Sequence, residues 1–315
     1  MDGATVLTRK GLDGQACSLA EGLAVSHGVG PGDRVALAVE PSTSWFVLAL
    51  ALAKLGATPA VLPPGHDPAA LAAAAGALLL APGDLPALAA PHAVAPRRLS
   101  GTHSPAPTVT FTAGGEPVVR AFDPARLTAA RVPLGDLLAR LRTAPGAVHL
   151  LAAPLHLAPA RLHADVTLVN GGTVVVARDA GPERVLALIA EHEVTTTFLD
   201  ATQAAALAAL PAEVRDAADV LSLALLLCEA PLAPGARARL EDLAGEDVVA
   251  ELRFTARAGD ALLRGPGEPD LAPLAGVELR EGPAGPEVRS PWRPARAGSP
   301  SSRPEPRAAA GRRAG

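Results

Sequence analysis

Short apolar runs alternate along this chain with stretches in which apolar residues recur at helical spacing. The runs predict buried strands, and the helical spacing predicts amphipathic helices. Glycine and proline clusters, such as residues 28–32 and 63–65, separate the two kinds of segment. Strands are predicted over residues 33–39, 57–62, 77–81, 108–112, 148–153, 173–177, 195–199, 221–227 and 248–252. Helices are predicted over residues 16–28, 45–55, 68–75, 124–142, 182–192, 201–210 and 234–243.

This regular alternation of strands and helices predicts an α/β fold with mostly parallel sheets that helices cover on both faces. After residue 258 the segments become short and are separated by glycine and proline, which predicts a small antiparallel β appendix over about 259–289. Residues 290–315 hold six arginines and one acid among many prolines and serines. Such a segment cannot bury a core, so we expect a disordered tail, and a nonfunctional tail is the preferred interpretation.

The composition narrows the classes of function. With 315 residues and 49% hydrophobic content the chain can bury a large core, but aromatic residues make up only 2% and tyrosine is absent. The net charge of −4 gives no general reason to expect a nucleic acid partner. Cys17 and Cys228 fit no metal or redox spacing. With no leader and no apolar run long enough to span a bilayer, a cytoplasmic protein without a membrane span is expected.

Candidate chemistry begins at Thr108–Arg120, where a β-branched strand runs into Thr112-Ala113-Gly114-Gly115. Backbone N–H groups in such a glycine loop can turn toward a phosphate. An ordinary Gly-Gly turn accounts for the same residues, and no lysine follows the loop. No Gly-x-Ser-x-Gly elbow and no His-Glu-x-x-His pattern occurs, so neither a serine hydrolase nor a zinc protease is supported.

Several further segments, in this order over most of the chain, resemble the adenylate-forming (AMP-binding) superfamily of acyl-CoA synthetases and luciferases. They are Gly28-Val29-Gly30-Pro31-Gly32-Asp33-Arg34-Val35-Ala36, Ala51–Ala57, Leu168–Val176, Val185–Phe198, Ala230-Pro231-Leu232 and Glu246–Leu252. The resemblance implies that residues 1–289 form that family's large N-terminal domain. The similarity is greatest to acid–CoA ligases that act on fatty, aromatic or steroid carboxylates.

The resemblance also implies ligands. Family members join a carboxylic acid to ATP with Mg²⁺ and then transfer the acyl group to a thiol such as CoA. By this resemblance, Thr112, Gly114 and Gly115 are the remnant of the phosphate loop, and Ala230 and Pro231 belong to the nucleotide pocket. His156 looks like the family's substrate-side histidine, although a histidine after a buried strand is more often a core residue.

Several positions depart from the family pattern. Val118 stands in place of the phosphate-loop lysine, and Glu116 adds a negative charge where phosphates would sit. Arg257 stands at the position of the magnesium-binding glutamate, and Arg253 at that of a tyrosine. Glu229 replaces a glycine of the nucleotide pocket. Since a cation cannot ligate a cation and like charges repel, ATP, Mg²⁺ and CoA binding are all in doubt, and no catalytic or metal-binding residue is assigned.

The sequence reaches its arginine-rich tail without the family's ribose-binding segment or its small C-terminal domain, so we expect a truncated domain that lacks the C-terminal ligase domain. Three interpretations follow. The chain is a degenerate ligase domain without activity, a pseudoenzyme that can partner an intact ligase. Alternatively, it binds an acyl group or nucleotide, or interacts with other proteins, without catalysis. The third is a fatty or aromatic acid–CoA ligase that is still active.

Overall fold

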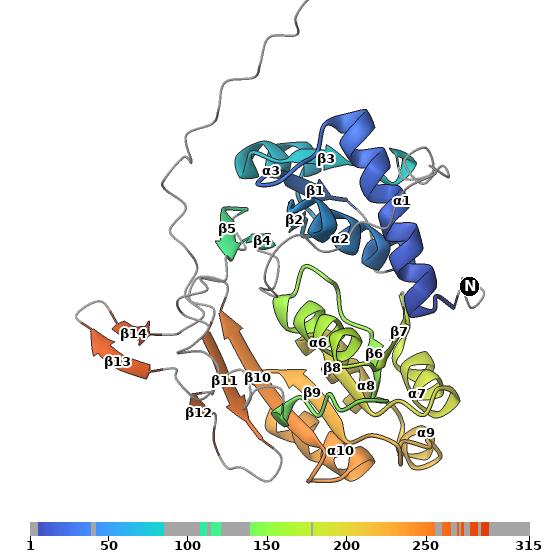
Figure 1. Cartoon of the computed structure of the whole chain (residues 1–315). Helices are drawn as coiled ribbons and strands as arrows, with labels where there is room; N and C mark the ends of the chain where they lie inside the picture. The colour runs from blue at the N-terminus through green and yellow to red at the C-terminus, as the bar shows by residue number, and fades with distance from the viewer. Residues whose placement is uncertain are drawn as a thin grey trace, which may run out of the picture.

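The computed structural model describes residues 6–38, 42–84, 108–111, 115–120, 139–177, 179–255, 260–265, 270, 272–273, 278–282 and 285–289. These residues form two large sheets, one in the upper and one in the lower half of Figure 1, with helices packed around and between them, and a separate two-stranded sheet. The α/β fold with parallel sheets that the sequence predicts is therefore confirmed.

The first sheet has five strands in the order β3-β1-β2-β4-β5. Strands β1 to β4 are parallel, and β5 pairs antiparallel with β4. The strands are β1 (Arg34–Leu37), β2 (Thr58–Val61), β3 (Leu78–Leu80), β4 (Thr108–Phe111) and β5 (Pro117–Arg120). Its helices are α1 (Arg9–His27), α2 (Thr43–Leu55) and α3 (Pro68–Ala75), with a short 3₁₀ turn at Pro82–Asp84.

The second sheet has seven strands in the order β12-β11-β10-β9-β8-β6-β7, of which β6 to β10 are parallel. The strands are β6 (Val148–Leu151), β7 (Thr173–Val176), β8 (Thr196–Leu199), β9 (Leu225–Glu229), β10 (Val249–Thr255), β11 (Asp260–Arg264) and β12 (Ala272–Pro273). Its helices are α6 (Ala158–Val169), α7 (Pro182–Glu191), α8 (Ala201–Ala208), α9 (Ala212–Asp216) and α10 (Pro234–Ala244).

The largest hydrophobic core lies between the two sheets. It joins Trp45 of α2 and Ala160 of α6 to Phe198 and Leu227 of the second sheet, and α2 and α6 lie between the two sheets, with α1 packed beside α2 (Figure 1). A second core covers the other face of the second sheet under α7, α8 and α10. A small third core joins α3 to the outer face of the first sheet. The two sheets are thus held by one shared apolar layer rather than by a linker alone.

Local signals explain most element boundaries. Gly28 and Gly56 end α1 and α2 in the left-handed conformation, with φ of 64° and 71°, which favours glycine. Ser42 begins α2, because its side chain accepts a hydrogen bond from Trp45 N. Asp67 does the same for α3 through two backbone N–H groups. Gly28 belongs to the cluster of residues 28–32 that the sequence analysis used as a boundary.

Helix α6 is the main element that the sequence analysis missed. Its face toward the sheet carries Arg161, His163 and Thr167, all buried, and these polar residues interrupt the apolar periodicity. The hairpin partner β5 was also missed. The strand predicted over 221–227 was wrong at its start, because Leu221 is 95% exposed and the strand begins at Leu225.

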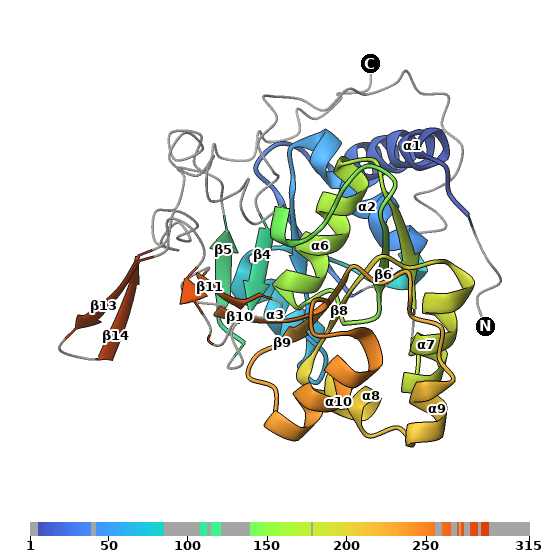
Figure 2. The same ribbon diagram turned by 90° about the horizontal axis from the view of Figure 1, so that it is seen from below.

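The C-terminal segments are antiparallel, as predicted, but they do not form one appendix. Strand β11 pairs antiparallel with β10 and so extends the seven-stranded sheet. Strands β13 (Glu278–Gly282) and β14 (Gly285–Arg289) form a separate hairpin, which stands clear of the other elements in both views (Figure 2). The predicted helix over 124–142, apart from its last residues, and the tail over 290–315 lie outside the described residues. Among the described helices, none has the length and apolar character that a bilayer crossing requires.

Candidate functional site

In the seven-stranded sheet, the direction in which the chain adds new strands reverses at β6. The chain runs from β6 to β7 on one side and then returns to β8 on the other side. Connections that leave neighbouring parallel strands in opposite directions open a crevice at the carboxyl edge, where ligands of open α/β sheets usually bind. His156 follows β6 and Asp200 follows β8, so both lie at this edge.

Asp200 is fixed at this edge by a capping box. Its carboxylate accepts a hydrogen bond from Gln203 N at 2.8 Å, and Gln203 Oε1 accepts one from Asp200 N at 3.2 Å. Gln203 Nε2 also donates to the carbonyl oxygen of Ala152 at 2.8 Å, just beyond β6. The start of α8 is therefore tied to the end of β6, and the two sides of the crevice form one unit.

His156 is half-buried at the mouth of this crevice. Burial lowers the pKa of its imidazole below the ordinary value of 6.5, and the negative charge of Asp200 partly offsets this effect. A neutral imidazole can donate one hydrogen bond and accept another. His156 is thus suited to hold a carboxylate or hydroxyl group.

The loop after β9 lies at the same edge and carries the two predicted nucleotide-pocket residues, Ala230 and Pro231. Their peptide bond is cis. Ala230 N donates to the carbonyl oxygen of Leu252 at 3.0 Å, and Leu232 N donates to Glu251 Oε2 at 2.9 Å. Three of the predicted site residues, His156, Ala230 and Pro231, therefore come together on one edge of the seven-stranded sheet.

Glu229, the last residue of β9, adds a carboxylate to this edge. In a strand, alternate residues face the same side, so Glu229 shares the face of Leu225 and Leu227, which belong to the core between the sheets. Its Oε2 atom accepts a hydrogen bond from Ala201 N at 3.3 Å. Together with Asp200, Glu229 makes the described part of this crevice acidic.

Gly115 lies elsewhere, at the edge of the five-stranded sheet. Its φ is 79°, and a Cβ atom there would lie 3.2 Å from Cδ2 of Leu71 and 3.6 Å from Cδ2 of His66. The backbone turns tightly against the start of α3, so a glycine is required. Thr112 and Gly114, the other predicted loop residues, lie outside the described residues.

The sequence analysis expected Val118 in the phosphate loop, at the lysine position. The structure instead has Val118 in β5, opposite Thr110 of β4. Arg253 lies in β10 and is exposed, and strand alternation puts it on the same face as Glu251. Arg257 lies outside the described residues.

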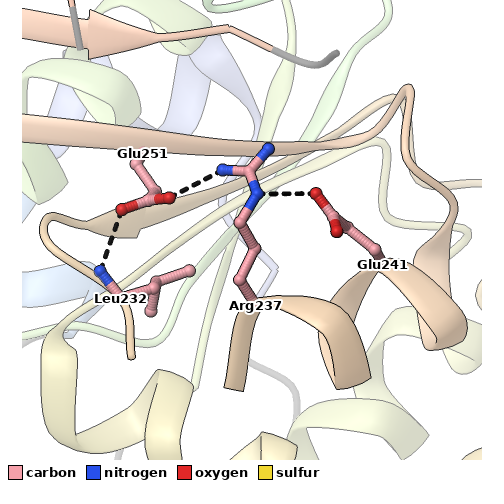
Figure 3. A network of polar contacts seen from close by, with 4 residues as sticks. All are labelled: Leu232, Arg237, Glu241 and Glu251. Atoms are coloured by element: carbon pink, nitrogen blue, oxygen red, sulfur yellow. Dashed lines mark hydrogen bonds and ion pairs between the residues drawn. The ribbon is translucent and has the colours of Figure 1, made fainter. Parts of the chain in front are cut away.

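Other residues at the edge were not predicted. The Asp200-x-x-Gln203 spacing is a capping-box pattern that is visible in the sequence. It could have predicted the start of α8 at this edge of the sheet. No sequence pattern predicted the role of Glu251, because the sequence of an apolar strand does not show which residue pairs with a buried acid. Figure 3 shows that its carboxylate joins the 229–233 loop to Arg237 of α10.

A second group of polar residues is buried under α6. The rings of His149 in β6 and His163 in α6 are 4.0 Å apart and tilted by 30°. His149 Nδ1 contacts Thr196 Oγ1 at 3.0 Å, and His163 Nε2 donates to the carbonyl oxygen of Leu141 at 3.1 Å. Ring lone pairs lie in the ring planes, so two nearly stacked imidazoles do not converge on a common ion. Within the described ranges, no group of three acid, histidine or cysteine side chains could hold a metal.

Comparison with known proteins agrees with this architecture. The family described as AMP-binding enzyme matches residues 1–77. The amide bond synthetase McbA from Marinactinospora thermotolerans has a similar structure, with a TM-score of 0.74 and 23% identity over 91% of this chain and 66% of McbA. Residues 1–77 are thus similar to the AMP-binding enzyme family, and 91% of the chain has a fold similar to that of McbA.

Two further proteins are similar to this chain in structure or in sequence. ATP-bound MatB from Rhodopseudomonas palustris has a TM-score of 0.68 and 21% identity over 90% of this chain and 65% of MatB. The olefin beta-lactone synthetase of Xanthomonas campestris is 45% identical over 60 residues, which are 19% of this chain and 11% of that protein. The chain thus spans about two thirds of the length of these solved structures.

Proposed function

We propose that this chain binds an adenine nucleotide and a carboxylic acid at the carboxyl edge of its seven-stranded sheet and does not join them. The relationship to adenylate-forming enzymes supports the choice of ligands. The observation that carries the proposal is the loop of residues 229–233, which is tied to β10 by two hydrogen bonds beside the crevice that His156 and Asp200 flank. The fixed backbone of this loop supports a nucleotide site, whereas the nearby carboxylates disfavour phosphate transfer.

A nucleotide ligand is supported by the position of the 229–233 loop and by the ATP-bound relative MatB. Ala230 and Pro231 expose backbone and small side chains at the edge of the sheet, where an adenine ring can lie against them. A carboxylic acid is supported by His156, because a half-buried neutral imidazole can donate a hydrogen bond to a carboxylate. The family's thiol acceptor, CoA, has no side chain assigned to it in this chain.

Loss of catalysis follows from charge. Adenylate formation needs cations that neutralise the departing pyrophosphate. Here Glu229 adds a carboxylate at the nucleotide edge, and Val118 and Arg257 occupy the sequence positions of the family's lysine and magnesium-binding glutamate. Repulsion between a carboxylate and a phosphate about 4 Å apart ranges from about 1 kcal/mol in water to several kcal/mol in a partly buried site.

Titration calorimetry with AMP and with Mg-ATP tests this proposal, together with pyrophosphate exchange over a panel of fatty and aromatic acids. We expect AMP to bind more tightly than Mg-ATP, because AMP lacks the two further phosphate groups that the carboxylate of Glu229 would repel, and we expect no exchange above background. Exchange with any acid would show that the chain forms an acyl-adenylate and overturn the non-catalytic part. The absence of heat with both nucleotides would overturn the nucleotide part.

A charge variant sharpens the test. Glu229→Gln removes the carboxylate and should tighten Mg-ATP binding by about tenfold, which corresponds to about 1.4 kcal/mol. Glu213→Gln is the matched control, because Glu213 is an exposed acid in the first turn of α9. If both variants change Mg-ATP affinity equally, the effect comes from net charge and not from the site.

The reduced state of both cysteines supports a reducing compartment such as the cytoplasm. Cys17 lies in α1 and Cys228 in β9, and both are buried thiols. Labelling of both thiols after denaturation of protein freshly isolated from cells would agree with this assignment.

A further inference from the structure

A buried ion pair lies directly behind the 229–233 loop. Glu251 of β10 is 3% exposed, and its two carboxylate oxygens have different partners. Oε1 accepts a hydrogen bond from Arg237 Nη1 of α10 at 2.6 Å, and Oε2 accepts one from Leu232 N at 2.9 Å. Figure 3 shows the carboxylate between the helix and the loop. One side chain thus links three elements.

The positive charge of Arg237 compensates the buried carboxylate of Glu251. A buried carboxylate is costly unless a cation and hydrogen-bond donors surround it. An ionised carboxylate accepts stronger hydrogen bonds than a neutral acid, and both of its oxygens remain acceptors. If Arg237 is removed, the carboxylate of Glu251 loses the cation that orients it, and its bond to Leu232 N weakens.

Arg237 also has a second acid partner, and this provides a matched control. Its Nε atom lies 2.6 Å from Oε1 of Glu241, one turn further along α10. Glu241 is more exposed than Glu251 and has no hydrogen bond to the loop among those described. Replacement of Glu241 therefore removes one partner of Arg237 and leaves the hydrogen bond between Glu251 and Leu232 N in place.

We propose that Arg237 is a positioning residue for the candidate nucleotide loop. By pairing with Glu251 it orients the carboxylate that holds Leu232 N, and so it fixes the backbone of residues 230–232. Arg237 acts through Glu251 and does not touch the ligand. The proposal rests on the proposed function for the identity of the ligand, whereas the order of the loop can be measured without any ligand.

The experiment compares the full chain with three variants: Arg237→Met, Glu251→Gln and Glu241→Gln. Amide hydrogen exchange at Leu232 reports the hydrogen bond directly. Labelling of Cys228 in a Cys17→Ser background reports opening behind the loop, because Cys228 pairs with Glu251 in the sheet register and is buried. Calorimetry with AMP reports the consequence for binding.

We expect Arg237→Met to raise exchange at Leu232, to speed Cys228 labelling and to weaken AMP binding, each by about tenfold, as for the loss of one charged hydrogen bond. Glu251→Gln keeps an acceptor for Leu232 N, so a smaller change in the same direction is expected, and this variant serves if Arg237→Met fails to fold. Glu241→Gln should leave Leu232 exchange within about twofold of the parent chain.

Each outcome has a distinct meaning. Unchanged exchange at Leu232 in folded Arg237→Met would overturn the positioning role. Faster amide exchange at Leu232 with unchanged AMP affinity would show that Arg237 orders the loop but does not matter for AMP binding. If the parent chain binds no AMP, the proposed function fails, and the exchange comparison still decides whether Arg237 fixes the loop.

Discussion

Acidification below about pH 6 should destabilise this protein through the histidine pair under α6. His149 and His163 are both fully buried, and their facing rings leave no room for a counter-ion between them. Burial lowers the pKa of His163 from 6.5 to about 4, and burial together with His163 lowers the pKa of His149 well below 6.5. Both imidazoles are therefore neutral in the folded chain at pH 7.

The size of the effect follows from linkage. Below pH 6.5 the unfolded chain takes up protons at these histidines and the folded chain does not, so stability falls as the pH falls. For His163 alone, a drop from 6.5 to about 4 corresponds to a loss of about 2 kcal/mol at about pH 5 and about 3 kcal/mol below the folded pKa. His149 adds a loss in the same direction.

Urea denaturation at several values between about pH 7.5 and 5 measures this slope. His163→Leu should flatten the curve relative to the parent chain, whatever its absolute stability, because one buried titrating group is gone. His27→Gln is the control, since that histidine is exposed at the end of α1. A parent curve that is flat over this range, or an equal slope in His163→Leu, would refute the reasoning.

Three further predictions concern packing and charge. Gly172→Ala should cost at least about 2 kcal/mol of unfolding free energy in a denaturant titration, because its Cβ would clash with the backbone oxygen of Ala147. Gly14→Ala is the control and should be neutral or stabilising, because the space around Gly14 is open. Asp200→Asn keeps the helix cap and should lower the pKa of His156 in an NMR titration, since it removes the charge that raises that pKa; an increase would contradict the assignment. Arg161→Leu should lower the melting temperature, because burial raises the pKa of Asp165 to about 6 and the charge of Arg161 opposes this rise, so the variant leaves Asp165 without its cation; a higher melting temperature would show that burial of Arg161 costs more than this interaction returns.

Much of the candidate site could be anticipated from local sequence. His156 follows an apolar strand, and Ala230-Pro231-Leu232 follows another, so both were expected at strand ends. The carboxyl ends of parallel strands share one edge, which is why these segments meet. The role of these residues in binding stays a prediction, as does the division of the chain into domains.

The sequence alone determined the class of elements and most of their limits, because these depend on neighbours within a few residues. Apolar runs, Ser42 and Asp67 caps, and the glycines after α1 and α2 are signals of this kind. Only the tertiary structure decided that β8 lies beside β6, which creates the crevice, and that α6 buries a histidine pair. Only the tertiary structure also decided that Glu251 accepts a hydrogen bond from Leu232 N in the 229–233 loop. Such features depend on partners far apart in the chain, and a buried polar residue looks the same in sequence whether its partner is present or absent.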